Sequence, residues 1–218
     1  MTSFGTAELR RAFLSKVGEE LERYGFDRRP AGQDFTRRMQ FGLWIVHVSF
    51  VTGQSAFDLS VDVAIRVDVV EDLVNADNRM LSVKEKRRTA TVGAELGNIA
   101  DHRFMNWHVQ GLGDIEPVVQ AIIHEFENWG LPYLERLSHL DVMLENLSRD
   151  DGSAWLYSPI PPARYKRAVA LAIVLQRFDH ARELARIGEE RLKQQGDPAL
   201  PGFRESIARM LQSTERRS

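Results

Sequence analysis

The side chains that could carry chemistry in this sequence do not form a known catalytic or metal-binding motif. His124 and Glu125 begin a zinc-protease pattern, but Asn128 occupies the position that requires the second histidine. The other histidines have no set of metal ligands at suitable spacing. The usual nucleophile motifs and phosphate-binding glycine loops are also missing in usable form. The sequence therefore predicts no catalytic residues, no metal site and no cofactor.

Polar residues along the predicted strands offer a more interesting surface. In residues 57–67, polar and apolar side chains alternate, and Asp62 and Arg66 project from the same face. His47 and His108 are expected to project from neighbouring strands. If this face of the sheet is open, it is a binding surface; if a helix covers it, it is part of the interior. Both alternatives remain open at the level of sequence.

A pocket between the sheet and its helices is a second place for a function. Arg66, Glu71 and His108 are then the candidate binding residues, because they would converge on such a pocket. A cavity with several titratable groups of shifted pKa is typical of a ligand-binding or active site. This reading predicts a small-molecule-binding protein or an enzyme.

The densest basic cluster, residues 84–88, could form a patch for phosphate groups or for an acidic protein together with Arg37 and Arg38. A solvated loop or edge strand explains the cluster more simply, since charge on an edge discourages unwanted strand pairing. The whole chain has 29 basic and 31 acidic residues and a formal net charge of -2. Nucleic acid is therefore not expected as a partner, because its binding depends on neutralising phosphates.

The elements that position these residues follow from hydrophobic periodicity. Apolar residues at helical spacing predict a helix over residues 6–24, which Gly25 ends in a left-handed conformation. Strands are predicted over residues 34–40, 43–51, 57–67, 89–96 and 104–109, with a short helix over 69–74 and a loop over 77–88. The connections between strands are short, which favours an antiparallel sheet.

The rest of the chain is predicted to be helical. One helix begins near Asp114 and is broken by Gly130 and Pro132, and a second covers residues 134–147. A linker over 149–162 then precedes helices over 163–175, 178–194 and 203–211. We therefore predict an α+β fold, with an antiparallel sheet that has helices packed on one side and a C-terminal helical hairpin region. The predicted domains are a sheet domain, 1–150, and a helical region, 163–218.

The C-terminal hairpin combines small and large apolar residues across two helices that a very short turn joins. In this it resembles a single tetratricopeptide-type unit, in which small residues allow close packing of the helices. Repeats of that type usually need about three copies to be stable, and one is visible here. An ordinary helical hairpin docked on the sheet domain is the simpler interpretation.

Several segments together resemble a bacterial family of unknown function, number 4304 in the domain-of-unknown-function series. They are the "YGF" that ends the first helix, a "W-x-V-x-V-x-F" strand from Trp44 to Phe50, the long alternating strand, the "GLPYLERL" segment from Gly130 to Leu137, and the final hairpin. The resemblance covers most of the chain and implies an α+β fold. It assigns no catalytic residues.

The chain has no cysteine, no pattern of a signal peptide and no apolar stretch long enough for a bilayer. With its excess of arginine over lysine, this leads us to expect a bacterial protein in the cytoplasm, without a membrane partner. Since catalytic motifs are missing, the leading hypothesis is a non-enzymatic protein that binds another protein, and toxin neutralisation is one form of it. The formation of a homo-oligomer stays open.

Overall fold

The computed structural model describes residues 5–28, 32–52, 56–76, 78–101 and 104–215. The chain packs as two compact units, which we describe separately. The first unit contains residues 1–65 and 94–136, and the second contains residues 66–93 and 137–218. Among the described residues, no helix has the length and apolar character needed to cross a bilayer.

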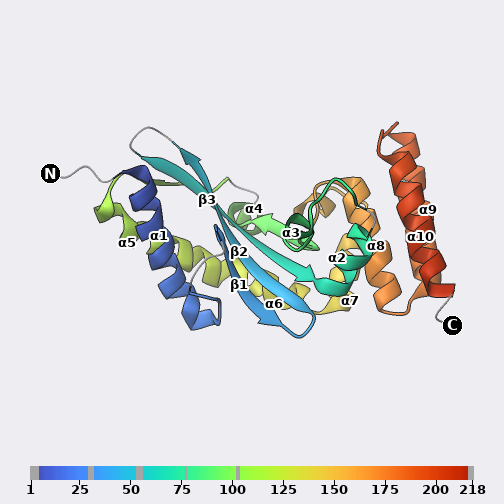
Figure 1. Cartoon of the computed structure of the whole chain (residues 1–218), viewed down its shortest axis with the longest axis horizontal. Helices are drawn as coiled ribbons and strands as arrows, with labels where there is room; N and C mark the ends of the chain where they lie inside the picture. The colour runs from blue at the N-terminus through green and yellow to red at the C-terminus, as the bar shows by residue number, and fades with distance from the viewer. Residues whose placement is uncertain (1–4, 29–31, 53–55, 77, 102–103, 216–218) are drawn as a thin grey trace. The chain divides into compact units, whose positions relative to one another are not determined.

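The five-stranded antiparallel sheet confirms the predicted α+β class (Figure 1). Its order is β1 (Asp34–Met39), β2 (Gly42–Thr52), β3 (Phe57–Val67) and β4 (Val92–Glu95), and β5 (Trp107–Val109) also pairs with β3. The register places Asp34 opposite His47 and Asp58 opposite His108. Facing pairs in adjacent strands project from the same side of a sheet, so both pairs bring a carboxylate beside an imidazole.

Helices of the first unit cover one face of the sheet. They are α1 (Thr6–Leu21), with the short η1 (Glu22–Tyr24), and α5 (Leu112–Glu125), which packs against α1. Phe13 of α1 meets the rings of Phe50 and Phe57 edge to face. Gly25 ends this helical segment at a φ of 78°, as predicted. The alternating apolar residues of β3 up to Ile65 have at most 1% exposure, so this face is fully buried.

The helix that begins at Leu112 does not break at Gly130 and Pro132, as the sequence suggested. It continues through a π-helical turn (Phe126–Gly130) into α6 (Leu131–Leu137). A regular α-helix disfavours proline, because the ring clashes with the carbonyl four residues earlier. The π turn directly precedes Pro132, and the N–H of Leu131 donates five residues back, to the carbonyl of Phe126. Gly130 is required for packing instead, since a Cβ there would lie 2.8 Å from a Leu96 methyl group and 2.9 Å from the Phe126 ring.

The second unit is mostly helical. Its elements are α2 (Asp68–Asn75), α3 (Val83–Lys86), α7 (Leu140–Ser148), η3 (Ala154–Leu156), α8 (Pro161–Val174), α9 (Phe178–Gln194) and α10 (Leu200–Glu215). Helix α8 is central to this unit, because it packs against α2, α7, α9 and α10. Helices α8 and α9 pack against one another as the predicted hairpin (Figure 1). Ala168, Ala172 and Ala181 of this hairpin are fully buried.

Two short α-helices were not predicted. Residues 83–86 lie in the predicted loop and form one helical turn, because Ser82 and Glu85 make a reciprocal capping box. Residues 96–101 form α4 (Leu96–Asp101) directly after β4. Both helices are shorter than two turns, so hydrophobic periodicity gives no usable signal for them.

The predicted linker, 149–162, lies inside the second unit and is held there by side-chain contacts. The hydroxyl of Tyr165 donates to Asp150 at 2.7 Å, and Arg191 forms an ion pair with the same carboxylate. Helices α8 and α9, which follow the segment in the chain, therefore fix Asp150. The units describe compactness and not independent folding, so the division into domains 1–150 and 163–218 stays a prediction.

We expect Gly130→Ala to lower the free energy of unfolding by about 1–3 kcal/mol, because the added methyl group overpacks a filled core. Gly113→Ala is the matched control, since nothing lies within 4 Å of a Cβ at that helical position. The control should stabilise the protein by roughly 0.5–1 kcal/mol, because alanine is the better helix former. Denaturant unfolding measures both, and equal effects of the two substitutions would contradict the packing role of Gly130.

Candidate functional site: the acidic sheet face

The face of the sheet opposite α1 and α5 carries polar side chains in the first unit. Along β3, residues of intermediate exposure alternate with buried ones, as the pattern of its sequence predicted. Of the two alternatives for this face, the open one fits the structure, because its side chains keep contact with solvent. We call it the acidic sheet face and define it by six residues: Asp34, His47, Asp58, Asp62, Glu95 and His108.

Two Asp–His pairs lie on this face. The Nδ1 atom of His47 is 2.6 Å from Oδ1 of Asp34, and the same two atoms of His108 and Asp58 are also 2.6 Å apart. Both pairs are direct consequences of strand register. The His47 side chain is 34% exposed and that of His108 is 52% exposed, so each imidazole is accessible from outside.

Asp62 differs from the other carboxylates of the face. It lies on the central strand β3, and its carboxylate accepts no hydrogen bond from any described residue. Burial raises its pKa above the ordinary value of 3.8, and the nearby His47 offsets only part of this effect. A partly desolvated carboxylate without a hydrogen-bond donor is unfavourable in the free protein.

Glu95, at the end of β4, adds a second carboxylate with a raised pKa. Burial is the largest cause, and the backbone N–H groups of Met105 and Gly97 oppose it by donating to Oε1 at 3.3 and 3.4 Å. The negative charge of Asp62 raises the pKa of Glu95 further. The two carboxylates therefore act on one another, and a positive charge placed on this face would relieve both.

The chemistry available here is proton exchange and the binding of cations or hydrogen-bond donors. Within the described parts of the chain, no three His, Asp, Glu or Cys side chains are grouped so that they could hold a metal ion. The face suits the side chains of a binding partner better than a single small ion.

The three candidate residues from the sequence are not all brought together. Arg66 and Glu71 belong to the second unit, whereas His108 belongs to the first and pairs with Asp58. Arg66 is only 5% exposed. Its guanidinium donates to Asp68 and Asp72 and to the carbonyl oxygens of Lys86 and Thr89, at 2.9–3.2 Å. Arg66 thus ties the basic 84–88 segment to α2, which is a structural role.

Glu71 continues the same network. Asn75 donates to Oε2 of Glu71 at 3.3 Å and to the Thr89 hydroxyl at 2.9 Å, and that hydroxyl also accepts from Arg66 at 3.0 Å. Glu71 is completely buried, and the guanidinium of Arg167 on α8 donates to both of its oxygens, at 2.8 and 3.4 Å. The polar groups of this network serve as hydrogen-bond partners for one another, and the pair of Arg167 with Glu71 joins α8 to α2.

Sequence reasoning identified His47, Asp62 and His108 as residues of a sheet face but missed the pairing with Asp34 and Asp58. The missing signal is strand register, which hydrophobic periodicity does not supply. It also missed Glu95, because the end of a four-residue strand has no clear alternation. The sequence did offer one clue to the partners of the two histidines, because Asp34 and Asp58 lie on other predicted strands of the same sheet.

We expect Asp62→Asn to leave the protein at least as stable as the wild type at pH 7. The raised folded-state pKa means that the native state holds the proton more tightly than the unfolded state, so the charge destabilises the fold above that pKa. The stability advantage of the variant should therefore appear as the pH rises from 3.8 through the folded-state pKa. Urea unfolding at several pH values measures it, with Asp179→Asn as the exposed control. A variant less stable than wild type at pH 7 would contradict the analysis.

We expect Arg167→Met to destabilise the protein by about 3–5 kcal/mol, because it leaves the buried Glu71 charge without its main partner. The double substitution Glu71→Leu with Arg167→Met should recover most of this loss, since no uncompensated charge remains. Arg182→Met, which breaks the exposed pair with Asp179, should cost under about 1 kcal/mol. Equal effects of Arg167→Met and Arg182→Met in denaturant unfolding would show that the buried pair is unimportant.

Comparison with protein-family models, with curated proteins and with solved structures finds no match for this chain. The resemblance to the domain-of-unknown-function family numbered 4304 therefore stays a prediction, and the geometry described above is the basis for a function.

Proposed function

We propose that this protein binds another protein through the acidic sheet face, without catalysing a reaction, and that the partner presents basic side chains there. The observation that carries the proposal is Asp62, a partly buried carboxylate that accepts no hydrogen bond from a described residue. Natural proteins retain such unfavourable groups mainly where function needs them. An arginine or lysine from a partner would supply the missing donor and the opposite charge.

The charge of the face supports a basic partner. It carries four carboxylates, and the two imidazoles are already engaged with Asp34 and Asp58. Complementary charge steers association and suppresses wrong partners. The two Asp–His pairs also fix the positions of four side chains before binding, which reduces the entropy cost of forming an interface.

Toxin neutralisation in the bacterial cytoplasm is one concrete form of this function. It requires a single dedicated partner and a tight complex, in which electrostatic steering gives fast association. A basic toxin surface that carries arginine would fit the face, because guanidinium groups pair with carboxylates through two parallel hydrogen bonds.

The alternative, a ligand pocket between sheet and helices, has less support. In the first unit that interface is filled by Phe13, Phe35, Phe57 and Phe126, each at most 1% exposed. The two carboxylates with raised pKa, Asp62 and Glu95, lie on the sheet's other face. The core around these four rings therefore offers no space to a small molecule unless side chains move. A pocket of about 300 Å³ does lie beside β5 and α5, but Glu125 is the one titratable residue in its described lining.

The test begins with capture of partners by the tagged full-length chain from lysate of the source organism at low salt. A purified partner is then titrated against the wild type and against the double variant Asp62→Asn with Glu95→Gln. We expect one stoichiometric partner with a basic surface, and we expect the double variant to weaken its affinity about tenfold or more, since truncating one side of a buried charge pair costs about 2–5 kcal/mol.

The matched control is Asp179→Asn with Glu189→Gln, which removes two exposed carboxylates from α9 and should leave the affinity unchanged. The association rate should fall as salt is added, because screening weakens steering. A partner that binds the double variant as tightly as the wild type, or a set of many weak partners, would overturn the proposal.

A further inference from the structure

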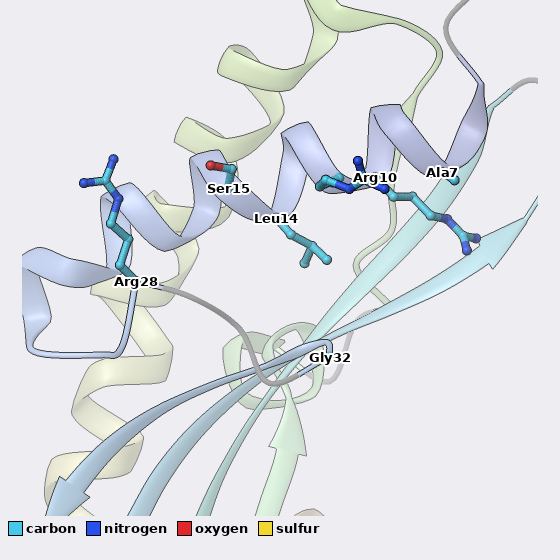
Figure 2. A pocket seen from close by; sticks show the side chains of 7 residues that line it. Ala7, Arg10, Leu14, Ser15, Arg28 and Gly32 are labelled. Atoms are coloured by element: carbon cyan, nitrogen blue, oxygen red, sulfur yellow. The ribbon is translucent and has the colours of Figure 1, made fainter.

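Many positively charged side chains of this protein have an opposite charge or an aromatic ring beside them. Figure 2 shows two of them, Arg10 and Arg28, at opposite ends of α1. Arg10 lies over the ring of Phe50, with its Cζ atom 4.7 Å from the ring centroid, and Arg28 contacts Glu19 at 3.1 Å. A partly buried positive charge without such a partner is unfavourable, because nothing replaces the hydration that burial removes.

Lys166, in the second turn of α8, carries such a charge. Its side chain is partly buried, and it forms no hydrogen bond or ion pair with any described residue. The buried carboxylate that α8 contacts on α2, that of Glu71, is already held by Arg167. The charge that acts on Lys166 is that of Arg209 on α10, which packs against α8, and this charge is also positive.

Lys16 shows what a carboxylate partner changes, since its side chain is also only 29% exposed. Its Nζ atom lies 2.9 Å from Glu116 and 3.7 Å from Glu20, and the hydrogen bond with Glu116 is the main cause of its raised pKa. The pKa of Lys166 is lowered instead, first by burial and then by the positive charge of Arg209. Lys166 therefore gives up its proton more readily than Lys16, and the neutral amine is the nucleophilic form of lysine.

We propose that Lys166 is a site of covalent acylation and that the donor is an anionic acyl phosphate. The Nζ atom attacks the carbonyl carbon of the donor, a carbon–nitrogen bond forms, and the bond from that carbon to the bridging oxygen breaks. Phosphate leaves with the electron pair, and the proton that the nitrogen loses passes to solvent. Arg209 favours an anionic donor over a neutral one, because its positive charge attracts the phosphate group.

The product of this reaction also suits its place in the fold. Acylation turns the ammonium group into a neutral amide, which removes both the repulsion from Arg209 and the cost of burying a second charge beside it. The inference does not depend on the proposed function, since Lys166 and Arg209 belong to the second unit, whereas the acidic sheet face belongs to the first.

The test treats the full-length protein with acetyl phosphate and follows each of its five lysines by peptide mass spectrometry over time. We expect Lys166 to be acetylated severalfold faster than Lys84 and Lys193, which are exposed and therefore keep their protons as hydrated ammonium groups do. Acetylation of Lys166 that is no faster than that of Lys84 and Lys193 would overturn the proposal.

Arg209→Gln tests the preference for an anionic donor. It should slow acetylation of Lys166 by acetyl phosphate, and it should have a smaller effect with the uncharged donor N-acetoxysuccinimide, which the positive charge does not attract. Arg204→Gln, which removes an exposed arginine from the same helix, is the matched control and should leave both rates unchanged. Thermal unfolding checks that both variants are folded. Equal slowing with the two donors, or no slowing with acetyl phosphate, would overturn the assignment of the donor.

Discussion

The alternation of apolar and polar residues along β3 is the constraint on which the first unit depends. Every second side chain from Phe57 to Ile65 has at most 1% exposure, and burial of each contributes roughly 1.5–3 kcal/mol. A one-residue shift of register would move this whole set to solvent. The strand is therefore fixed in place, and so are the polar residues between the buried ones. Burial of the apolar residues on one face therefore places Asp58 and Asp62 on the other face of the strand.

The two units differ in whether their buried polar groups have hydrogen-bond or ion-pair partners. In the second unit, Arg66, Glu71 and Arg167 form a network in which each charge meets an opposite charge or a hydrogen-bond partner. Such a network holds elements together but leaves little capacity for a ligand. In the first unit, burial of the Asp62 carboxylate carries a cost that the described structure offsets only in part, through the nearby His47. This contrast is the reason why we propose the acidic sheet face, and not the cluster of the second unit, as the binding surface.

Charge is also distributed unevenly within the first unit. The acidic sheet face carries four carboxylates, whereas Arg10 and Arg11 lie next to one another on α1. The sum over the chain, -2, conceals both. Since Coulomb interactions in salt solution decay over about 10 Å, a ligand or partner responds to the local group of charges and not to the total.

The sequence by itself determined the α+β class, most of the strands and helices, and the two-faced character of β3, because these follow from local periodicity. It did not reveal that the helix continues past Pro132, since Gly130 and Pro132 are both residues that commonly end a helix. It placed Arg66, Glu71 and His108 in one hypothetical site, although Arg66 and Glu71 share an internal network and His108 pairs with Asp58. Strand register, close approach at glycines and the partners of each charge are relations between distant residues, so only the tertiary structure decided them.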